Sequence, residues 1–288
     1  MSRELAGGWL VRGLAHDKAV RFLAADTRRI VEYARVAHGL SPLASRLVGE
    51  AVLAAVFMSA HIKGDERITL QIQSDTPKFG LLCDVGAEGG IRARLTPPIP
   101  KHRSGSGIHG MLLAIKSNAH QELYRGVTEL RHASLAEALS EHMLSSVQVD
   151  VVMHTEVRCH ESGEVAMAGG VMVERLPEHA RFAHYDHEEF VERFSGLRDR
   201  PAGEVLASLA FGDLAGAGVE VLERRALEWC CSCSTERIEA ILVALGKEEI
   251  QSMLEAEEVV EVTCQFCNLA YPVEHDRLQQ LLVGLPGD

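Results

Sequence analysis

Four cysteines near the C-terminus have the spacing of a metal site. Cys231 and Cys233 form a Cys-x-Cys pair, Cys264 and Cys267 form a Cys-x-x-Cys pair, and residues 234–263 separate the two. Zn²⁺ in structural sites prefers four thiolate or imidazole ligands in a tetrahedron, with each sulfur about 2.3 Å away. Two close-spaced thiolate pairs on separate loops supply such a set. We therefore expect these four cysteines to bind one Zn²⁺ per reduced chain.

The residues around each pair predict how the sulfurs are positioned. Short apolar runs at 260–262 and 269–271 flank the second pair, which predicts a β-hairpin with the cysteines in its turn. After the first pair, Ser234 or Thr235 is expected to cap a helix that ends at Gly246. That helix has apolar residues at i, i+3, i+4 and i+7, namely Ile238, Ile241, Leu242 and Leu245.

Four cysteines with this spacing have other possible uses besides a redox-sensitive zinc centre. A permanent structural zinc site has the same spacing, so spacing alone does not distinguish a structural zinc from a redox-regulated one. Two disulfides in a secreted module are disfavoured, because Met1–Arg12 has no export-signal pattern. A thioredoxin-type pair needs a helix N-terminus, whereas Cys264 and Cys267 lie in a predicted turn. We therefore expect these cysteines to bind zinc in a reducing compartment.

The charge distribution indicates which partners to exclude. The chain has a net charge of −12, and residues 229–288 contain eleven acidic and three basic residues. Zinc ribbons that bind DNA or RNA usually carry basic patches. The apolar run 51–58 is shorter than the roughly 20 residues of a membrane span and is flanked by Arg46, Glu50 and His61. We expect no nucleic acid and no membrane as partners.

The first 176 residues predict an α+β body. Residues 18–37 are interpreted as an amphipathic helix, and Ser41 and Pro42 as the N-cap and first turn of a helix reaching about residue 62. Ser134 and Glu137 form a capping box for a further helix to about residue 144. Apolar alternation and turn signals predict strands at 68–73, 80–85, 91–95, 111–115, 126–130, 149–153 and, as the last strand of the body, 165–173.

Residues 177–228 have a different pattern and are predicted to be a helical linker. Phe190, Val191 and Phe194 form one short amphipathic piece, and a second is followed by clustered glycines. Such pieces bury too little apolar surface to fold alone, so they depend on docking against neighbours. An ordinary interdomain linker is the alternative. The predicted organisation is a body at 1–176, a metastable linker at 177–228 and a small zinc module at 229–288.

The motifs together resemble the heat-shock protein 33 family, whose members are cytosolic, redox-regulated holdase chaperones. The C-terminal matches are Trp229-Cys-Cys-Ser-Cys-Ser234, Leu245-Gly246, Glu248-Glu249-Ile250, and Cys264-Gln-Phe-Cys267 followed by Tyr271. Further matches lie at Tyr124-Arg-Gly-Val127 and Ala168-Gly-Gly-Val171. The resemblance covers nearly the whole chain and is weak only at about 178–228.

The resemblance implies an ATP-independent chaperone that oxidation activates. It implies Cys231–Cys233 and Cys264–Cys267 disulfides with loss of the metal, unfolded proteins as clients, and a homodimer in the oxidised form. It also implies later transfer of clients to ATP-dependent chaperones. A constitutive zinc-ribbon interaction module without redox regulation is the alternative function.

The remaining reactive residues give little support for an enzyme. Asp186-His187 has no nucleophile at a defined spacing, and Gly246-Lys247 lacks the rest of a phosphate-binding loop. Cys83 and Cys159 are interpreted as small apolar residues in strands. Cys230 differs from the family motif at its position, and its thiol is a possible competitor for metal or disulfide partners. We expect no enzymatic activity.

Overall fold

The computed structural model describes residues 7–15, 18–76, 78–96, 108–132, 135–176, 188–189, 192, 194, 213–214, 217–255 and 260–284. The chain divides into two compact units, Met1–Cys230 and Cys231–Asp288, and each is described by itself. The first unit contains the predicted α+β body, and the second contains the four clustered cysteines.

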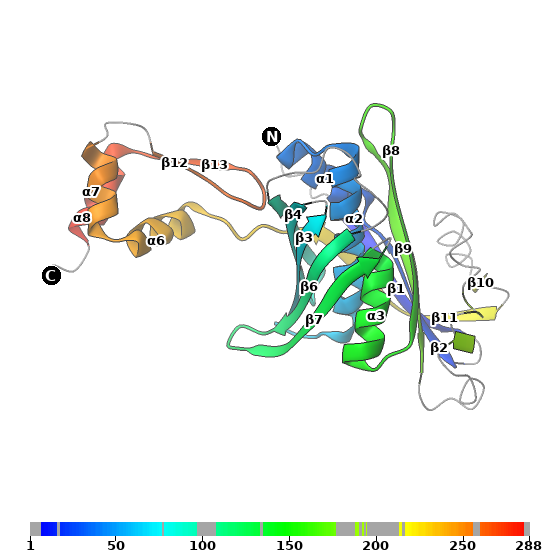
Figure 1. Cartoon of the computed structure of the whole chain (residues 1–288). Helices are drawn as coiled ribbons and strands as arrows, with labels where there is room; N and C mark the ends of the chain where they lie inside the picture. The colour runs from blue at the N-terminus through cyan, green and yellow to red at the C-terminus, as the bar shows by residue number, and fades with distance from the viewer. Residues whose placement is uncertain are drawn as a thin grey trace. The chain divides into compact units, whose positions relative to one another are not determined.

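One large sheet forms the body (Figure 1). Among the described residues its strand order is β7-β6-β3-β4-β5-β11-β1-β2-β9-β8, and β10 pairs with β11. Every neighbouring pair is antiparallel except β11 and β5. The strands are β1 Gly7–Ala15, β2 Val20–Asp26, β3 Arg67–Thr76, β4 Lys78–Gly86, β5 Gly90–Thr96, β6 Ile108–Ser117, β7 Glu122–His132, β8 Val151–Cys159, β9 Val165–Arg175, β10 Asp213–Leu214 and β11 Ala217–Trp229.

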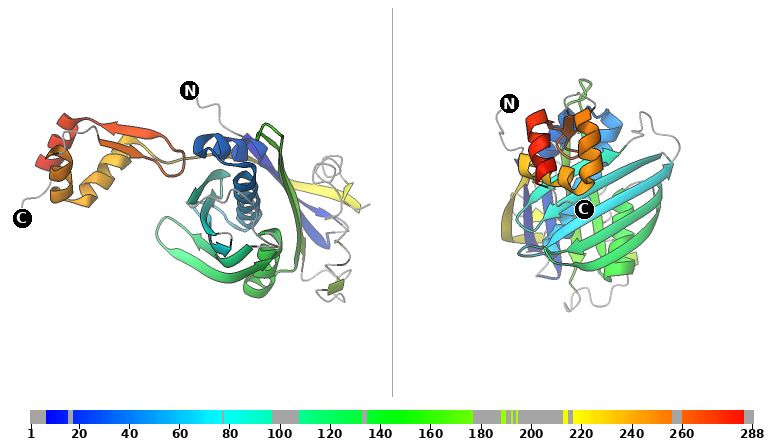
Figure 2. Two further views of the ribbon diagram at one scale, coloured as in Figure 1. Left: turned by 45° about the horizontal axis from the view of Figure 1, so that its top comes forward. Right: turned by 90° about the vertical axis from the view of Figure 1, so that its left-hand side faces the viewer.

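Three helices, α1 (Arg28–His38), α2 (Pro42–Met58) and α3 (Leu135–His142), pack on one face of this sheet. The sheet curves around α2, which contacts β3, β4 and β5 on one side and β8 and β9 on the other (Figure 2). The predicted cap is confirmed, because the Ser41 hydroxyl accepts a hydrogen bond from the Ala44 N–H at 3.2 Å and Pro42 occupies the first turn. With the short helix Ser59–His61, α2 is long and apolar enough to cross a membrane, but 83% of its apolar window is buried in the body. It is the central core helix, as predicted.

The strands predicted between residues 68 and 130 are confirmed. Alternate residues of β3, Ile68, Leu70 and Ile72, are buried against the helices, while Gln71 and Gln73 are exposed on the other face. The hairpins β3–β4, β4–β5 and β6–β7 follow the apolar alternation and turn signals of the sequence. The capping box at Ser134 lies outside the described residues.

The predicted helix at 18–37 is wrong in its first half. Residues Val20–Asp26 form strand β2, and α1 starts only at Arg28. Strand β2 lies between β1 and β9 and is buried on both faces. A strand buried on both faces has a continuous apolar run instead of alternation, which resembles one side of a helix.

The C-terminal part of the predicted linker is also different. Residues Ala217–Trp229 form strand β11, so Val165–Arg175 is not the last strand of the body. Strand β11 pairs with β1 over most of its length and with β5 at Glu228 and Trp229. Strand β1 itself was not predicted. Pairing of segments about 210 residues apart leaves no local signal in the sequence.

Before β11, the described part of the linker packs against the body through Phe194. Phe194 is 2% exposed and belongs to a cluster on the sheet face opposite the main helices. Its neighbours in that cluster come from β1, β2, β8 and β9 and from Ala19, and they include Val11, Phe22, Val152, Val171 and Val173. The other linker residues named above, Phe190 and Val191, lie outside the described residues.

The second unit is a small α+β module. Its elements are α6 Thr235–Leu245, α7 Lys247–Glu255, β12 Val260–Thr263, β13 Ala270–Val273 and α8 His275–Val283. Five buried residues form its core, namely Ile238, Leu242, Ile250, Val273 and Leu278. The other two residues of the apolar pattern expected for this helix, Ile241 and Leu245, are 52% and 51% exposed. Of the four apolar residues in this pattern, only Ile238 and Leu242 are buried against the described residues of the module.

Candidate metal centre

The structure brings the four predicted cysteines together. The sulfur atoms of Cys231, Cys233, Cys264 and Cys267 all lie within 4.8 Å of one another. The Sγ atoms of Cys231 and Cys264 are 3.6 Å apart, and those of Cys233 and Cys267 are 3.3 Å apart. A tetrahedron with zinc–sulfur bonds of about 2.3 Å has sulfur–sulfur edges of about 3.8 Å. The four cysteines therefore fit a metal ion of this kind.

The second pair lies in the hairpin turn, as the sequence predicted. Strands β12 and β13 are antiparallel, with Thr263 opposite Ala270 at the end of the ladder. The Cys264 N–H donates to the Leu269 carbonyl at 2.9 Å, and the Asn268 N–H donates to the Cys264 carbonyl at 2.8 Å. Asn268 closes the turn with φ 56°, a left-handed conformation that asparagine tolerates. This turn holds both sulfurs on one side of the hairpin end.

The first pair is held by the start of α6. Ser234 is the N-cap, and its hydroxyl accepts a hydrogen bond from the Arg237 N–H at 3.3 Å. The Arg237 guanidinium reaches back and donates to the Ser232 carbonyl at 2.9 Å. The two interactions fix the chain between Cys231 and Cys233, and they explain how a Cys-x-Cys pair presents both sulfurs to one point.

The four sulfurs have unequal proton affinities. Burial raises the pKa of Cys231 to about 11 and also raises the pKa of Cys267. Burial acts in the same direction on Cys264, but hydrogen bonds from the Cys267 and Phe266 N–H groups and from the Cys231 and Cys267 side chains outweigh it and lower the pKa of Cys264 to about 7. Metal ligands must be thiolates, so binding of a metal would release protons from this cluster.

Tyr271 also belongs to the site. Its hydroxyl donates a hydrogen bond to the Cys233 sulfur at 3.0 Å. This hydrogen bond raises the pKa of Tyr271. The sequence placed Tyr271 only in a family motif and in a strand. The spacing of the residues does not indicate that the Tyr271 hydroxyl contacts a sulfur 38 positions earlier.

The other three cysteines lie outside the cluster. Cys230 is exposed at the end of β11, and its N–H donates to the Ile91 carbonyl of the body at 2.7 Å. Cys83 is buried in β4, and burial raises its pKa strongly. Cys159 is half-buried, and burial likewise raises its pKa. The last two fit the predicted role of small apolar residues.

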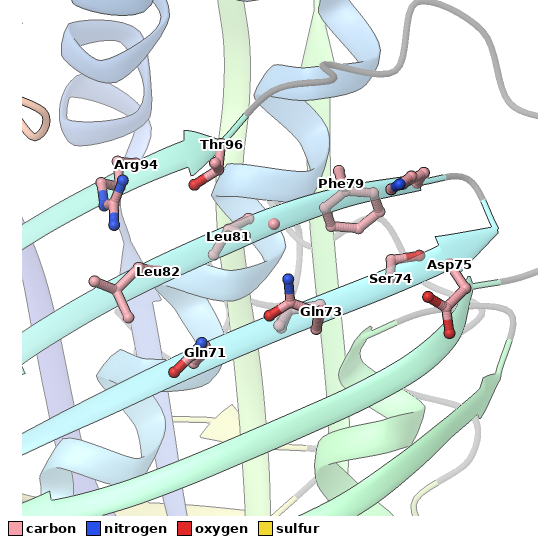
Figure 3. Close-up of a pocket in the computed structure, with 12 residues that line it drawn as sticks. Gln71, Gln73, Ser74, Asp75, Phe79, Leu81, Leu82, Arg94 and Thr96 are labelled. Atoms are coloured by element: carbon pink, nitrogen blue, oxygen red, sulfur yellow. The ribbon is translucent and has the colours of Figure 1, made fainter.

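The body also carries an open pocket of about 380 Å³ over β3, β4 and β5 (Figure 3). Gln71, Gln73 and Arg94 line it, and Gly80 leaves space beside Thr96. The lining contains amide side chains, charged side chains and leucines, without a cysteine or histidine. The Asp186-His187 pair that the sequence raised as a catalytic candidate lies outside the described residues.

Comparisons with known proteins agree with this arrangement. The family model for Hsp33 protein matches residues 9–274. The chain is 30% identical over 289 residues to a 33 kDa chaperonin of Geobacillus kaustophilus, with 96% of this chain and 97% of the relative covered. It is also 30% identical over 292 residues to a 33 kDa chaperonin of Symbiobacterium thermophilum, covering 96% and 98%.

A crystal structure of the 33 kDa chaperonin from Thermotoga maritima has the same fold. It superposes with a TM-score of 0.78 at 24% identity and covers 96% of this chain and 97% of the other. The match supports the α+β class predicted from the sequence. With a family model that spans nearly all of its length, this chain belongs to the Hsp33 family.

Proposed function

We propose that this protein is an ATP-independent holdase chaperone of the cytoplasm, switched on by oxidation of a zinc-bound cysteine centre. The observation that carries the proposal is the group of four sulfur atoms within 4.8 Å, in a chain of the Hsp33 family. Its clients are unfolded or partly unfolded proteins, and the oxidised form is a homodimer that passes clients to ATP-dependent chaperones. It is not an enzyme.

Cys231, Cys233, Cys264 and Cys267 would hold the Zn²⁺. Bound zinc keeps the four sulfurs as thiolates and ties the hairpin to the start of α6. Structural zinc can contribute on the order of 10 kcal/mol to folding. A whole domain is typically stable by only about 5–15 kcal/mol, and this module has a core of five buried residues. Loss of the metal should therefore unfold the module.

Oxidation would remove the ligands in pairs. One thiolate attacks hydrogen peroxide, so a sulfur–oxygen bond forms, the oxygen–oxygen bond breaks, and hydroxide leaves. The second thiolate of the pair then displaces hydroxide from the oxidised sulfur and forms the disulfide. Two protons from solvent convert the hydroxides to water. The proposed products are the Cys231–Cys233 and Cys264–Cys267 disulfides, neither of which can hold the metal as before.

Release of the linker would then expose the client-binding surface. Phe194 covers apolar side chains of the body, among them Phe22, Val171 and Val173. Docking of short helical pieces is at the low-stability end of a protein, so such pieces respond first when a neighbouring module unfolds. Apolar side chains exposed on a sheet face are a suitable surface for unfolded chains, which are rich in exposed apolar groups.

One experiment tests the proposal. Zinc release and suppression of client aggregation are measured in the same sample before and after mild peroxide treatment. The proposal expects about one zinc per reduced chain, and coupled release of zinc and gain of activity. Client binding that oxidation leaves unchanged would instead support a constitutive zinc-ribbon interaction module.

A further inference from the structure

We infer that Tyr271 is a positioning residue that makes the Cys233 thiolate less reactive and so sets how readily oxidants open the metal centre. The inference takes one premise from the proposed function, namely that the four cysteine sulfurs bind Zn²⁺. The observation behind it is the hydrogen bond from the Tyr271 hydroxyl to the Cys233 sulfur at 3.0 Å. This distance is short for a hydrogen bond to sulfur, which is a larger acceptor than oxygen.

The donor is held in place by the module itself. Tyr271 lies in β13 opposite Val262 of β12, and its ring packs against the module core. Cys233 comes from the other half of the site, just before α6. The hydroxyl therefore joins the hairpin to the Cys-x-Cys loop from a fixed position. A donor that is already ordered binds its acceptor with little further loss of conformational freedom.

A hydrogen bond draws charge density away from a thiolate. Hydrogen bonds to charged groups are among the stronger ones in proteins, and partners around metal ligands tune the metal and its ligands. A zinc ion with four thiolates has a charge of about −2, and the module around it is acidic. A donor at Cys233 therefore stabilises the charged, reduced centre and lowers the nucleophilicity of that sulfur toward peroxide.

Tyr271 differs from the other donors near the sulfurs. Backbone N–H groups of Phe266 and Cys267 donate to Cys264, and that of Leu269 donates to Cys267. Those donors belong to the turn and remain whatever side chains are present. The Tyr271 hydroxyl depends on a single oxygen atom, so evolution or mutagenesis can change it without altering the turn.

The effect should be specific to one disulfide. A sulfur in a disulfide carries no charge and is a poor acceptor, so the hydrogen bond is lost when Cys233 is oxidised. Tyr271 therefore opposes formation of the Cys231–Cys233 disulfide directly. Its effect on the Cys264–Cys267 pair should be smaller, because its hydroxyl does not donate to either of those sulfurs.

The test compares Tyr271→Phe with a matched control, Val262→Ala. Tyr271→Phe keeps the ring and removes the hydroxyl, whereas Val262→Ala weakens packing opposite the ring and keeps the hydroxyl. For the metal-loaded full chain we expect one zinc in both variants. Peroxide should release zinc about 3- to 10-fold faster from Tyr271→Phe than from wild type, and mass spectrometry should find the Cys231–Cys233 disulfide earlier.

A spectroscopic measurement separates tuning from a change in stability. With Co²⁺ in place of zinc, loss of a hydrogen bond raises the energy of the sulfur electrons and moves the sulfur-to-metal charge-transfer band to longer wavelength. We expect this shift in Tyr271→Phe and not in Val262→Ala.

Three results would overturn the inference. The first is a wild-type band and oxidation rate in Tyr271→Phe, and the second is equal acceleration in both variants. The third is loss of zinc from Tyr271→Phe before oxidation, because the hydroxyl would then hold the site together instead of tuning one sulfur. A wild-type chain without bound zinc would contradict the proposed function as well.

Discussion

The indole ring of Trp229 packs beside the phenol ring of Tyr33, with ring centroids 4.9 Å apart and ring planes 35° apart. Trp229 is only 7% exposed although it lies two residues before Cys231. On either side of it, the Glu228 N–H donates to the Gly89 carbonyl at 3.0 Å and the Cys230 N–H donates to Ile91. The ordered body therefore extends to the residue before the cysteine cluster.

The strand before the cysteines should stay folded when the module unfolds. After oxidation or chelation of the metal, hydrogen exchange should show lasting protection of β11 and of Ile68–Leu95, because these strands lie inside the body sheet. Amides of β12 and β13 should lose protection. The linker at residues 190–217 should lose protection before the body does.

Loss of protection in β11 together with the module would contradict this division of the chain. It would mean that the pairing of β11 with β1 and β5 depends on the metal. An unchanged linker would count against the proposed activation mechanism, while leaving the metal centre itself intact.

Substitution of Cys264 by serine should remove the metal and unfold only the module. A serine hydroxyl is a much weaker zinc ligand than a thiolate, and structural zinc can contribute on the order of 10 kcal/mol to folding. Metal analysis should find no tightly bound zinc, and NMR should show loss of dispersed signals from the module but not from the body. Cys159→Ser, in the body, is the matched control and should keep one zinc.

Retention of wild-type zinc affinity in Cys264→Ser would show that the ligand set is wrong. A variant that loses zinc but keeps a folded module would show that the five-residue core suffices for its stability.

Substitution of Cys230 by serine should leave zinc bound and simplify the oxidised products. Cys230 is exposed at the end of β11 and does not belong to the group of four sulfurs. Adjacent cysteines close a disulfide only with strain, so Cys230 is expected to pair wrongly with Cys233 or to react with an oxidised neighbour. Disulfide mapping should find a larger share of Cys231–Cys233 in the variant. Loss of zinc would make Cys230 a ligand, and an unchanged distribution would make it a bystander.

A buried histidine should make the body less stable in mild acid. His142 is fully buried at the end of α3, where it hydrogen-bonds to the Thr128 hydroxyl at 2.8 Å, and burial lowers the pKa of His142. The unfolded chain then takes up a proton at a pH where the folded chain does not. The stability that neutral His142 contributes to the body is fully present above the ordinary histidine pKa of about 6.5. It is lost as the pH falls from there toward the lower pKa of His142 in the folded chain.

Urea unfolding should show that the body loses stability as the pH falls below about 6.5. NMR titration of His142 in the folded chain should place its pKa below that of an unfolded control peptide. His142→Gln should reduce the pH dependence. A folded-state pKa at or above the peptide value would contradict the argument.

The sequence by itself determined the elements whose signals are local. The spacing of four cysteines, the turn between two short apolar runs and the Ser234 cap were enough to predict that the four sulfurs cluster, where the hairpin lies and where α6 starts. Alternating apolar residues likewise predicted β3 to β7, because a strand with one buried face repeats every two residues. These features depend on neighbours only a few positions away.

Tertiary structure decided the features that depend on distant contacts. Strand β2 was mistaken for a helix because burial on both faces removes the alternation, and β11 was mistaken for linker because its partners β1 and β5 are far away in the chain. The same applies to the site. Cysteine spacing predicts which sulfurs meet, but only the folded module brings the Tyr271 hydroxyl to Cys233, since a hydrogen bond over 38 positions depends on how the hairpin packs against α6.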